Sequence, residues 1–219
     1  MDAVSPITHE PLPAPTVRAL GVADYLPTWR AMQDYTTRRD AATPDEIWLL
    51  QHPPVFTLGL AGKPEHLLRT DTGIAVVKID RGGQITYHGP GQLVAYLLLD
   101  MKRRRLSVRP LVRKMESAVI DLLGDYGIRA KHRADAPGVY VTVDQTESKI
   151  AALGLRVKNG CCYHGLALNI DMDLTPFNAI NPCGYAGMQV TQLRDLGVPD
   201  TLSRVAEKLT RHLLHALEN

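Results

Sequence analysis

Strand-like runs bounded by proline, glycine and aspartate recur along the chain and predict a protein rich in β-strands. The longest run, residues 92–101, is almost continuously apolar, which is typical of a strand buried within a sheet. Further strands are expected at residues 16–21, 46–52, 55–59, 74–81, 138–143, 149–157 and 161–170.

Three other segments have helical spacing. Residues 24–41 predict a helix with Asp24 as a cap and Pro27 in its first turn. Residues 107–123 repeat apolar side chains every three or four positions. A C-terminal helix carries on one side Leu202, Val205, Leu209, Leu213 and Leu217. Strand clusters interrupted by a few helices predict an α+β fold with a large mixed β-sheet.

Composition limits the class of protein. The 219 residues are 45% hydrophobic and 22% charged, which fits one globular domain. The proline-rich residues 1–15 predict a flexible tail, so the domain is expected at 16–219. No apolar run is long enough to span a membrane, and the N-terminus lacks the basic start of a secretory signal. Three cysteines without a CxxC pair argue against disulfides and zinc and favour the cytoplasm.

Glycine is densest in RGGQITYHGPGQLVAY, residues 81–96. Such a segment lets the backbone approach a ligand closely, and its N–H groups can face an oxyanion or a carbonyl. A hairpin that needs glycine for its turns is the competing interpretation. The segment matches neither the phosphate-binding pattern GxxxxGK[ST] nor GxGxxG before a helix.

Two reactive side chains stand in unusual settings. Cys183 lies between Pro182 and Gly184, which indicates a thiol displayed on a turn, although a small hydrophobe in a loop would look the same. Lys149 leads into an apolar strand, where it either extends to water or is desolvated and exchanges protons near neutral pH. Beside a thiol, such a lysine would stabilise the thiolate.

Four motifs in order, RGGQITYHGPGQ, SKIAALG, HGLALN and NPCGY, resemble the lipoyl(octanoyl) transferase family from residue 17 to the C-terminus. The resemblance implies a fold similar to biotin and lipoate protein ligases, with Cys183 as acyl-thioester nucleophile and Lys149 as its proton partner. It also implies a set of substrate-binding residues: Arg81, Gly82, Gly83, Gln84, Ile85, Thr86, Tyr87, His88, Ala152, Leu153, Gly154, Gly165, Leu166 and Ala167. His52, in QHPPVFT, matches a further family motif of uncertain role.

The resemblance further implies an activity. An octanoyl group would pass from octanoyl-acyl carrier protein to Cys183, and then to a lysine of a lipoyl domain. Acceptors would be the lipoyl domains of 2-oxoacid dehydrogenase complexes and the glycine cleavage H protein. No cofactor, metal, nucleic acid or membrane partner is expected, and the chain should be a monomer.

Three other interpretations remain open. An ATP-dependent lipoate or biotin ligase would share the fold but needs no nucleophilic cysteine. A non-enzymatic basic module would use residues 102–114, which hold seven basic residues and no acid. The same run could also be a solvated helix start, or a patch that steers an acidic carrier. Finally, Cys162 and His164 share a strand face by alternation and could form a hydrolase dyad.

Overall fold

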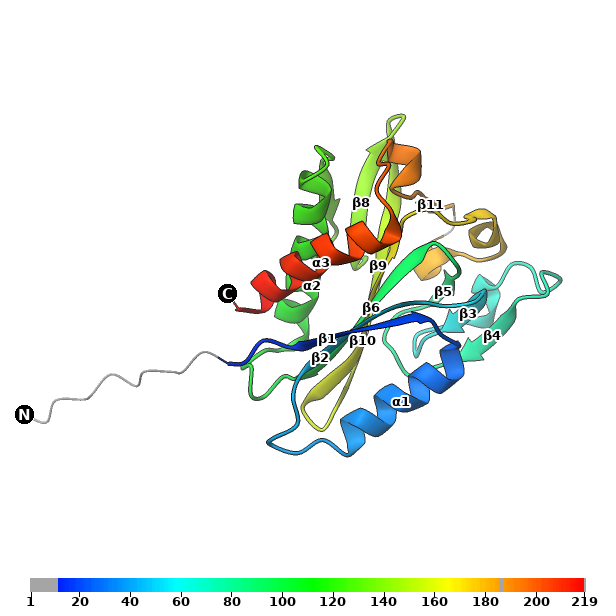
Figure 1. Ribbon diagram of the computed structural model, residues 1–219. Coiled ribbons are helices and arrows are strands. Elements are labelled where there is room, and N and C mark those ends of the chain that lie inside the picture. The colour runs from blue at the N-terminus through cyan, green and yellow to red at the C-terminus, as the bar shows by residue number, and fades with distance from the viewer. Residues whose placement is uncertain (1–11, 186, 219) are drawn as a thin grey trace, which may run out of the picture.

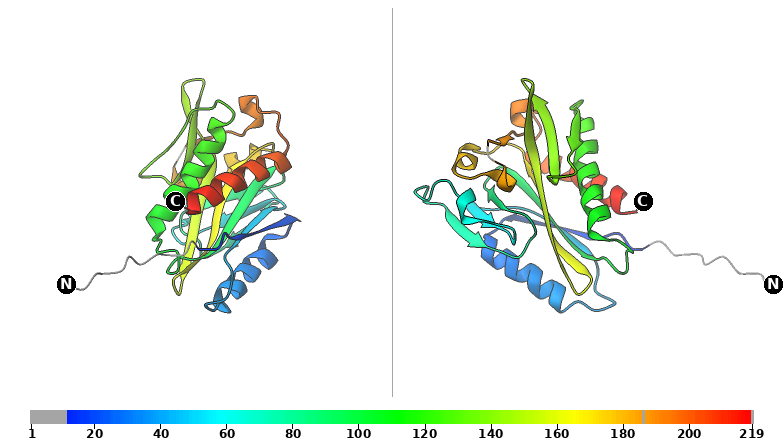
Figure 2. Two further views of the ribbon diagram at one scale, coloured as in Figure 1. Left: turned by 60° about the vertical axis from the view of Figure 1, so that its left-hand side comes forward. Right: turned by 180° about the vertical axis from the view of Figure 1, so that it is seen from behind.

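The computed structural model describes residues 12–185 and 187–218, apart from the side chain of Cys183. Most of the expected tail, residues 1–15, lies outside the described residues. A large sheet crosses the middle of the molecule (Figure 1). Helices α2 and α3 cover one face, and α1 and a smaller sheet lie against the other (Figure 2).

The large sheet has eight strands and is mixed, as expected. Only β1–β2 and β11–β9 pair in parallel, and the other neighbours are antiparallel. Its path is β1 (Thr16–Val22), β2 (Glu46–Gln51), β6 (Gln92–Asp100), β10 (Cys161–Asn169), β9 (Thr146–Lys158), β8 (Gly138–Val143) and β7 (Ala130–His132), with β11 (Gln189–Val190) beside β9.

Residues 93–99 of strand β6 are aliphatic or aromatic because both faces of the strand are buried. Leu93 and Leu97 face the core beneath α2 and α3, whereas Val94 and Leu98 face the core beneath α1. Alternation of side chains along a strand requires apolar residues at every position in such a place.

The helices begin close to where the spacing predicts them. They are α1 (Tyr25–Thr37), α2 (Val108–Gly124) and α3 (Leu202–Glu218). Helix α1 ends before the expected residue 41, and its N-cap residue Asp24 makes no side-chain capping bond. Its carbonyl oxygen instead accepts a bond from the Thr28 hydroxyl at 2.7 Å. No helix among the described residues is long and apolar enough to cross a membrane.

The smaller sheet was not expected as a separate unit. It has the order β4 (Ala75–Lys78), β3 (Val55–Leu58) and β5 (Ile85–His88). Short 3₁₀ helices complete the fold: η1 (Pro64–His66), η2 (Thr175–Ala179), η3 (Pro182–Gly184) and η4 (Arg194–Leu196). A bridge between Leu67 and Ile180, and a bond from Asn181 N–H to the His66 carbonyl at 2.8 Å, tie η1 to η3.

Candidate active site

A mainly apolar cavity of about 40 Å³ lies between the smaller sheet and the large one. Its walls come from β5, β6, β9 and β10, with Tyr25 from α1 and Arg81 from the loop before β5. An apolar cavity with a few polar groups is the usual form of a small-ligand site.

Most of the predicted substrate-binding residues line this cavity: Arg81, Thr86, His88, Ala152, Leu153, Gly154, Gly165, Leu166 and Ala167. The structure thus brings together three segments that are far apart in the sequence. Leu153 and Leu166 form part of the apolar wall of the cavity.

The other predicted residues of the glycine-rich segment do not line the cavity. Ile85 and Tyr87 pack into a separate apolar core because side chains along β5 alternate between two sides. Gly82 N–H donates to Leu155 O at 2.9 Å, and the carbonyl of Gly83 accepts from Ala61. The Gln84 side chain accepts from Lys63 N–H at 3.1 Å. These residues hold the loop in place.

Four lining residues were missed in the sequence: Tyr25, Val94, Tyr96 and His164. Tyr25 stands at a helix start, and Val94 and Tyr96 lie within a continuous apolar run. Nothing in their local pattern separates them from core residues. For His164, in the HGLALN motif, strand alternation predicts only a pairing with Cys162.

Buried histidines lie in and behind the polar part of the cavity wall: His88 and His164 line it, and His52 lies behind Tyr96. The Nε2 atom of His52 lies 2.8 Å from the Tyr96 hydroxyl, and its Nδ1 lies 2.6 Å from Ala23 O. His88 Nδ1 lies 2.7 Å from the Gln92 amide oxygen. Burial lowers the pKa of His52 to about 4 and that of His88 to about 3, so both rings are neutral near pH 7. No group of three or more His, Cys, Asp or Glu among the described residues could hold a metal ion.

Arg81 brings a buried positive charge to the cavity wall. Its guanidinium donates to the carbonyl and hydroxyl oxygens of Thr57 at 2.8 and 2.9 Å, and to the Gly82 carbonyl at 3.0 Å. These bonds fix its orientation, so the charge faces a defined part of the cavity.

The proposed Cys162–His164 dyad does not form. Cys162 packs under α2 and α3, and its thiol donates to Leu97 O at 3.5 Å. His164 has a positive φ of 64°, contacts the Tyr96 ring, and has its Nε2 3.1 Å from an Asp80 carboxylate oxygen. The positive φ breaks the strand alternation on which the expected shared face depended. Burial also raises the pKa of the Cys162 thiol to about 12.

Lys149 is buried. Its strand, β9, begins at Thr146 and not at Lys149 as expected. Its ammonium group donates to Pro137 O at 3.1 Å and lies 5.2 Å from the Tyr140 ring centroid. A Cβ on Gly138 would come within 2.4 Å of Lys149 Cε, so a glycine is needed there for the lysine to fit. Lys149 is therefore not a surface residue extending to water.

The chain returns to Lys149 directly after Cys183. The backbone of Cys183 lies in η3, and β11 then pairs with Ser148 and Lys149. A small cavity of about 10 Å³ is lined by both Lys149 and Pro182, the residue before Cys183. The fold therefore brings the η3 backbone close to Lys149, although Cys183 and Lys149 are 34 positions apart in the sequence (183 − 149).

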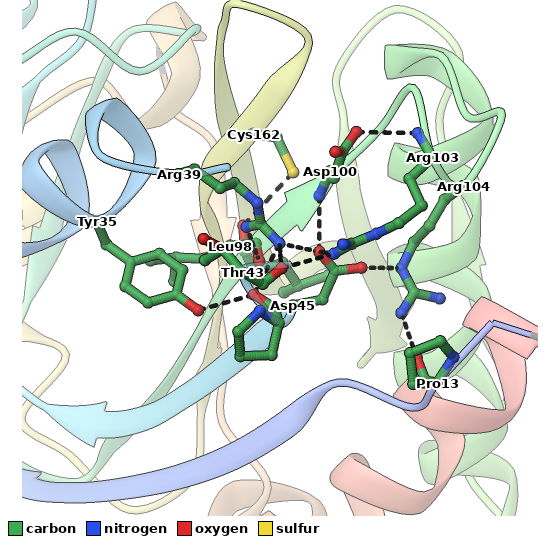
Figure 3. A network of polar contacts seen from close by, with 12 residues as sticks. Pro13, Tyr35, Arg39, Thr43, Asp45, Leu98, Asp100, Arg103, Arg104 and Cys162 are labelled. Atoms are coloured by element: carbon green, nitrogen blue, oxygen red, sulfur yellow. Dashed lines mark hydrogen bonds and ion pairs between the residues drawn. The ribbon is translucent and has the colours of Figure 1, made fainter. Parts of the chain in front are cut away.

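The basic run is only partly a surface feature. Arg103 and Arg104, in the turn before α2, both bind the carboxylate of Asp45, which also binds Arg39 (Figure 3). The Arg104 side chain is 5% exposed and the Arg103 side chain is 24% exposed. A solvated helix start is therefore wrong for these two residues, and their charges are engaged in the fold.

Comparison with known proteins shows the family of the chain. The family model described as the lipoyl protein ligase A/B catalytic domain matches residues 24–214. The chain belongs to this family. An octanoyltransferase of Dechloromonas aromatica is 61% identical over 93% of the chain and 97% of its own length, and one of Azoarcus sp. is 63% identical over 92% and 87%. The expectation of an acyltransferase enzyme is confirmed.

Solved structures confirm the fold of this ligase A/B family member. A bipartite lipoate protein ligase of Thermoplasma acidophilum superposes with a TM-score of 0.75 at 18% identity, over 93% of the chain and 84% of its own. A biotin protein ligase of Aquifex aeolicus gives 0.58 at 14% identity, over 92% and 70%. At such low identity, the likeness concerns the fold alone.

Proposed function

We propose that the chain transfers an octanoyl group from octanoyl-acyl carrier protein to a lysine of lipoyl domains, through a thioester on Cys183. The observation that carries the proposal is the position of Lys149. Lys149 lines a small cavity together with Pro182 of the η3 turn. Thr86 and Ala152 line both this cavity and the apolar cavity. The octanoyltransferases at about 60% identity support the choice of acyl group.

In the proposed first step, the Cys183 thiolate attacks the carbonyl carbon of the donor thioester. The carrier sulfur leaves as a thiol after taking up a proton, and the octanoyl group remains on Cys183. Lys149 is the proton carrier for this exchange, and its buried charge favours the thiolate. In the second step, the acceptor lysine amine attacks the new thioester. Lys149, which gave its proton to the carrier sulfur in the first step, takes the proton that the amine loses, and an amide forms as Cys183 leaves as the thiolate.

The other two cysteines are poor alternatives as nucleophiles. Burial raises the pKa of the thiols of both Cys161 and Cys162, which keeps them protonated near pH 7. An ATP-dependent ligase mechanism has no use for Cys183 and is not favoured. The natural acceptors, the monomeric state and the cytoplasmic location remain predictions.

The test is to incubate the protein with octanoyl-carrier protein, measure its intact mass, and locate the octanoyl group after trypsin digestion. We expect one octanoyl group on Cys183, and none on a Cys183→Ala variant. An adduct on Cys161 or Cys162, or normal turnover by Cys183→Ala, would overturn the assignment.

The role of Lys149 is tested by Lys149→Met, which keeps the bulk and removes the proton carrier. We expect the rate to fall by at least about two decades, the usual scale of general acid–base catalysis. Lys158→Met is the matched control, because Lys158 lies on the same strand and is exposed. Equal rates for both variants would show that Lys149 carries no proton in the reaction.

A further inference from the structure

A larger groove lies beside the η3 turn and outside the apolar cavity. It has a volume of about 430 Å³, and its walls come from η2, η3 and β11, with Leu68 from the segment after η1. In Figure 1, β11 and the neighbouring short helices gather at one side of β9. The NPCGY motif contributes Asn181 and Pro182 to its wall, but the mechanism above does not use this groove.

The groove, the Lys149 cavity and the apolar cavity adjoin one another through shared wall residues. The groove shares Phe177, Pro182 and Val190 with the walls of the Lys149 cavity. That small cavity in turn shares Thr86 and Ala152 with the apolar cavity. Lys149 therefore stands between two spaces, one apolar and one open to solvent.

The groove is polar but carries no charge. Among residues 12–185 and 187–218, its lining contains no Asp, Glu, Lys, Arg or His, and it includes the side-chain amides of Asn178, Asn181 and Gln189. Asn178 and Gln189 are exposed at its surface. Amide groups pair well with other amides, since each offers both hydrogen-bond donors and an acceptor.

We propose that this groove binds the amide-containing thiol arm of the acyl donor, the pantetheine-type chain that joins the octanoyl thioester to its carrier. The inference rests on the proposed function. A thioester carbonyl beside Lys149 has its acyl chain on one side and its thiol arm on the other. The apolar lining of the first cavity suits an acyl chain, and the amide-lined groove suits an arm built of amides and short hydrocarbon links.

An acceptor lysine is a poorer occupant of the same groove. Its side chain ends in a cation, which a binding surface would complement with carboxylates. No carboxylate in the described part of the chain lines the groove. The two occupants therefore predict opposite effects of adding a negative charge.

The test uses Asn178→Leu and the nearly isosteric Asn178→Asp, with Ser203→Leu on α3 as a control of similar exposure. Each protein is assayed with octanoyl-pantetheine and with an octanoyl thioester of 2-mercaptoethanol, which has no amide. For Asn178→Leu we expect KM for octanoyl-pantetheine to rise about three- to ten-fold, as for one lost hydrogen bond. Acylation of Cys183 by the amide-free donor should change by less than about two-fold.

Several outcomes would overturn the groove assignment. Unchanged KM for octanoyl-pantetheine in both Asn178 variants would place the arm elsewhere. Equal losses with both donors would indicate damage to the catalytic centre. A lower KM for the lipoyl-domain acceptor in Asn178→Asp would assign the groove to the acceptor lysine. Acylation of the parent protein by the amide-free donor tests the proposed function separately, because that donor has no arm to bind.

Discussion

At the scale of single residues, Gly138 determines whether Lys149 can occupy its buried position. A Cβ at residue 138 would lie 2.4 Å from Lys149 Cε and 2.9 Å from Ala151 O. The N–H of Gly138 is held at 3.0 Å by the buried carboxylate of Glu116, so the backbone has little freedom to retreat. The missing side chain is thus part of the lysine's binding site.

The variant Gly138→Ala should therefore impair catalysis and stability together. We expect activity to fall at least about ten-fold as Lys149 is displaced, and the free energy of unfolding to fall by about 1–3 kcal/mol from overpacking. Turnover measures the loss of activity, and urea unfolding measures the loss of stability. Gly124→Ala is the control, since a Cβ there meets nothing within 4 Å. Parent-like turnover by Gly138→Ala would show that the lysine tolerates displacement.

The buried histidines make stability depend on pH. The unfolded chain protonates His52 below about pH 6.5, whereas the folded protein keeps it neutral down to about pH 4 because of burial. Protons thus favour the unfolded state in this window, and stability falls as pH falls. His52 accounts for about 2 kcal/mol between pH 6.5 and 5, at about 1.4 kcal/mol per pH unit.

Urea unfolding at pH 7 and pH 5 measures this contribution. In His52→Gln, whose amide can replace both ring hydrogen bonds, the loss of stability between these pH values should shrink by about 2 kcal/mol. The exposed His132→Gln should keep the pH dependence of the parent protein. An unchanged dependence in His52→Gln would mean that the ring is protonated in the folded state at pH 5.

At the scale of elements, the sequence predicts what depends on local pattern. Strand β6 and helices α2 and α3 follow directly from their apolar spacing. The short β7 and β11 carry no such pattern, because their pairing is decided by where longer strands already lie. The side on which His164 lies could not be predicted either, since a positive φ at one residue reverses the alternation.

The junction before α2 shows the same limit for charge. Residues 102–114 contain seven basic residues, a pattern that predicts a charged surface. However, Asp45, which is far away in the sequence, binds two of them. Figure 3 shows this carboxylate surrounded by Arg39, Arg103 and Arg104. Arg104 also donates to Pro13 O at 3.0 Å, so the cluster joins the start of β1 to two loops.

Removing the carboxylate should unfold this junction. Asp45→Asn leaves Arg39 and Arg104 with buried charges and no counter-ion, so we expect a loss of about 3–5 kcal/mol in the free energy of unfolding. Asp71→Asn is the control, because its pair with Arg69 is exposed and should have little effect. Urea unfolding of both variants decides. A small effect at Asp45 would mean that the arginines reach water instead.

At the scale of the whole molecule, the candidate site is assembled from four distant segments between two sheets. Position-by-position reasoning could nominate Lys149 and Cys183 as reactive groups, but only the resemblance to a family could join them. The pairing of β11 with β9 brings the two segments together in the fold, and neither strand has a sequence pattern that predicts the other. The groove beside η3 could not be predicted, because its amides come from η2, the residue before η3 and β11, which no sequence pattern brings together.

The narrowness of the space beside Lys149 has a consequence for the order of events. A cavity of about 10 Å³ has room for about one water-sized group. On the proposed path, the donor sulfur and the acceptor amine both approach the same carbonyl carbon there. They must do so in turn, so the acylated protein, free of its donor, is the species that meets the lipoyl domain. The octanoyl-carrier protein and the lipoyl domain would then compete for the same centre. On this path, turnover slows when either of the two proteins is in large excess.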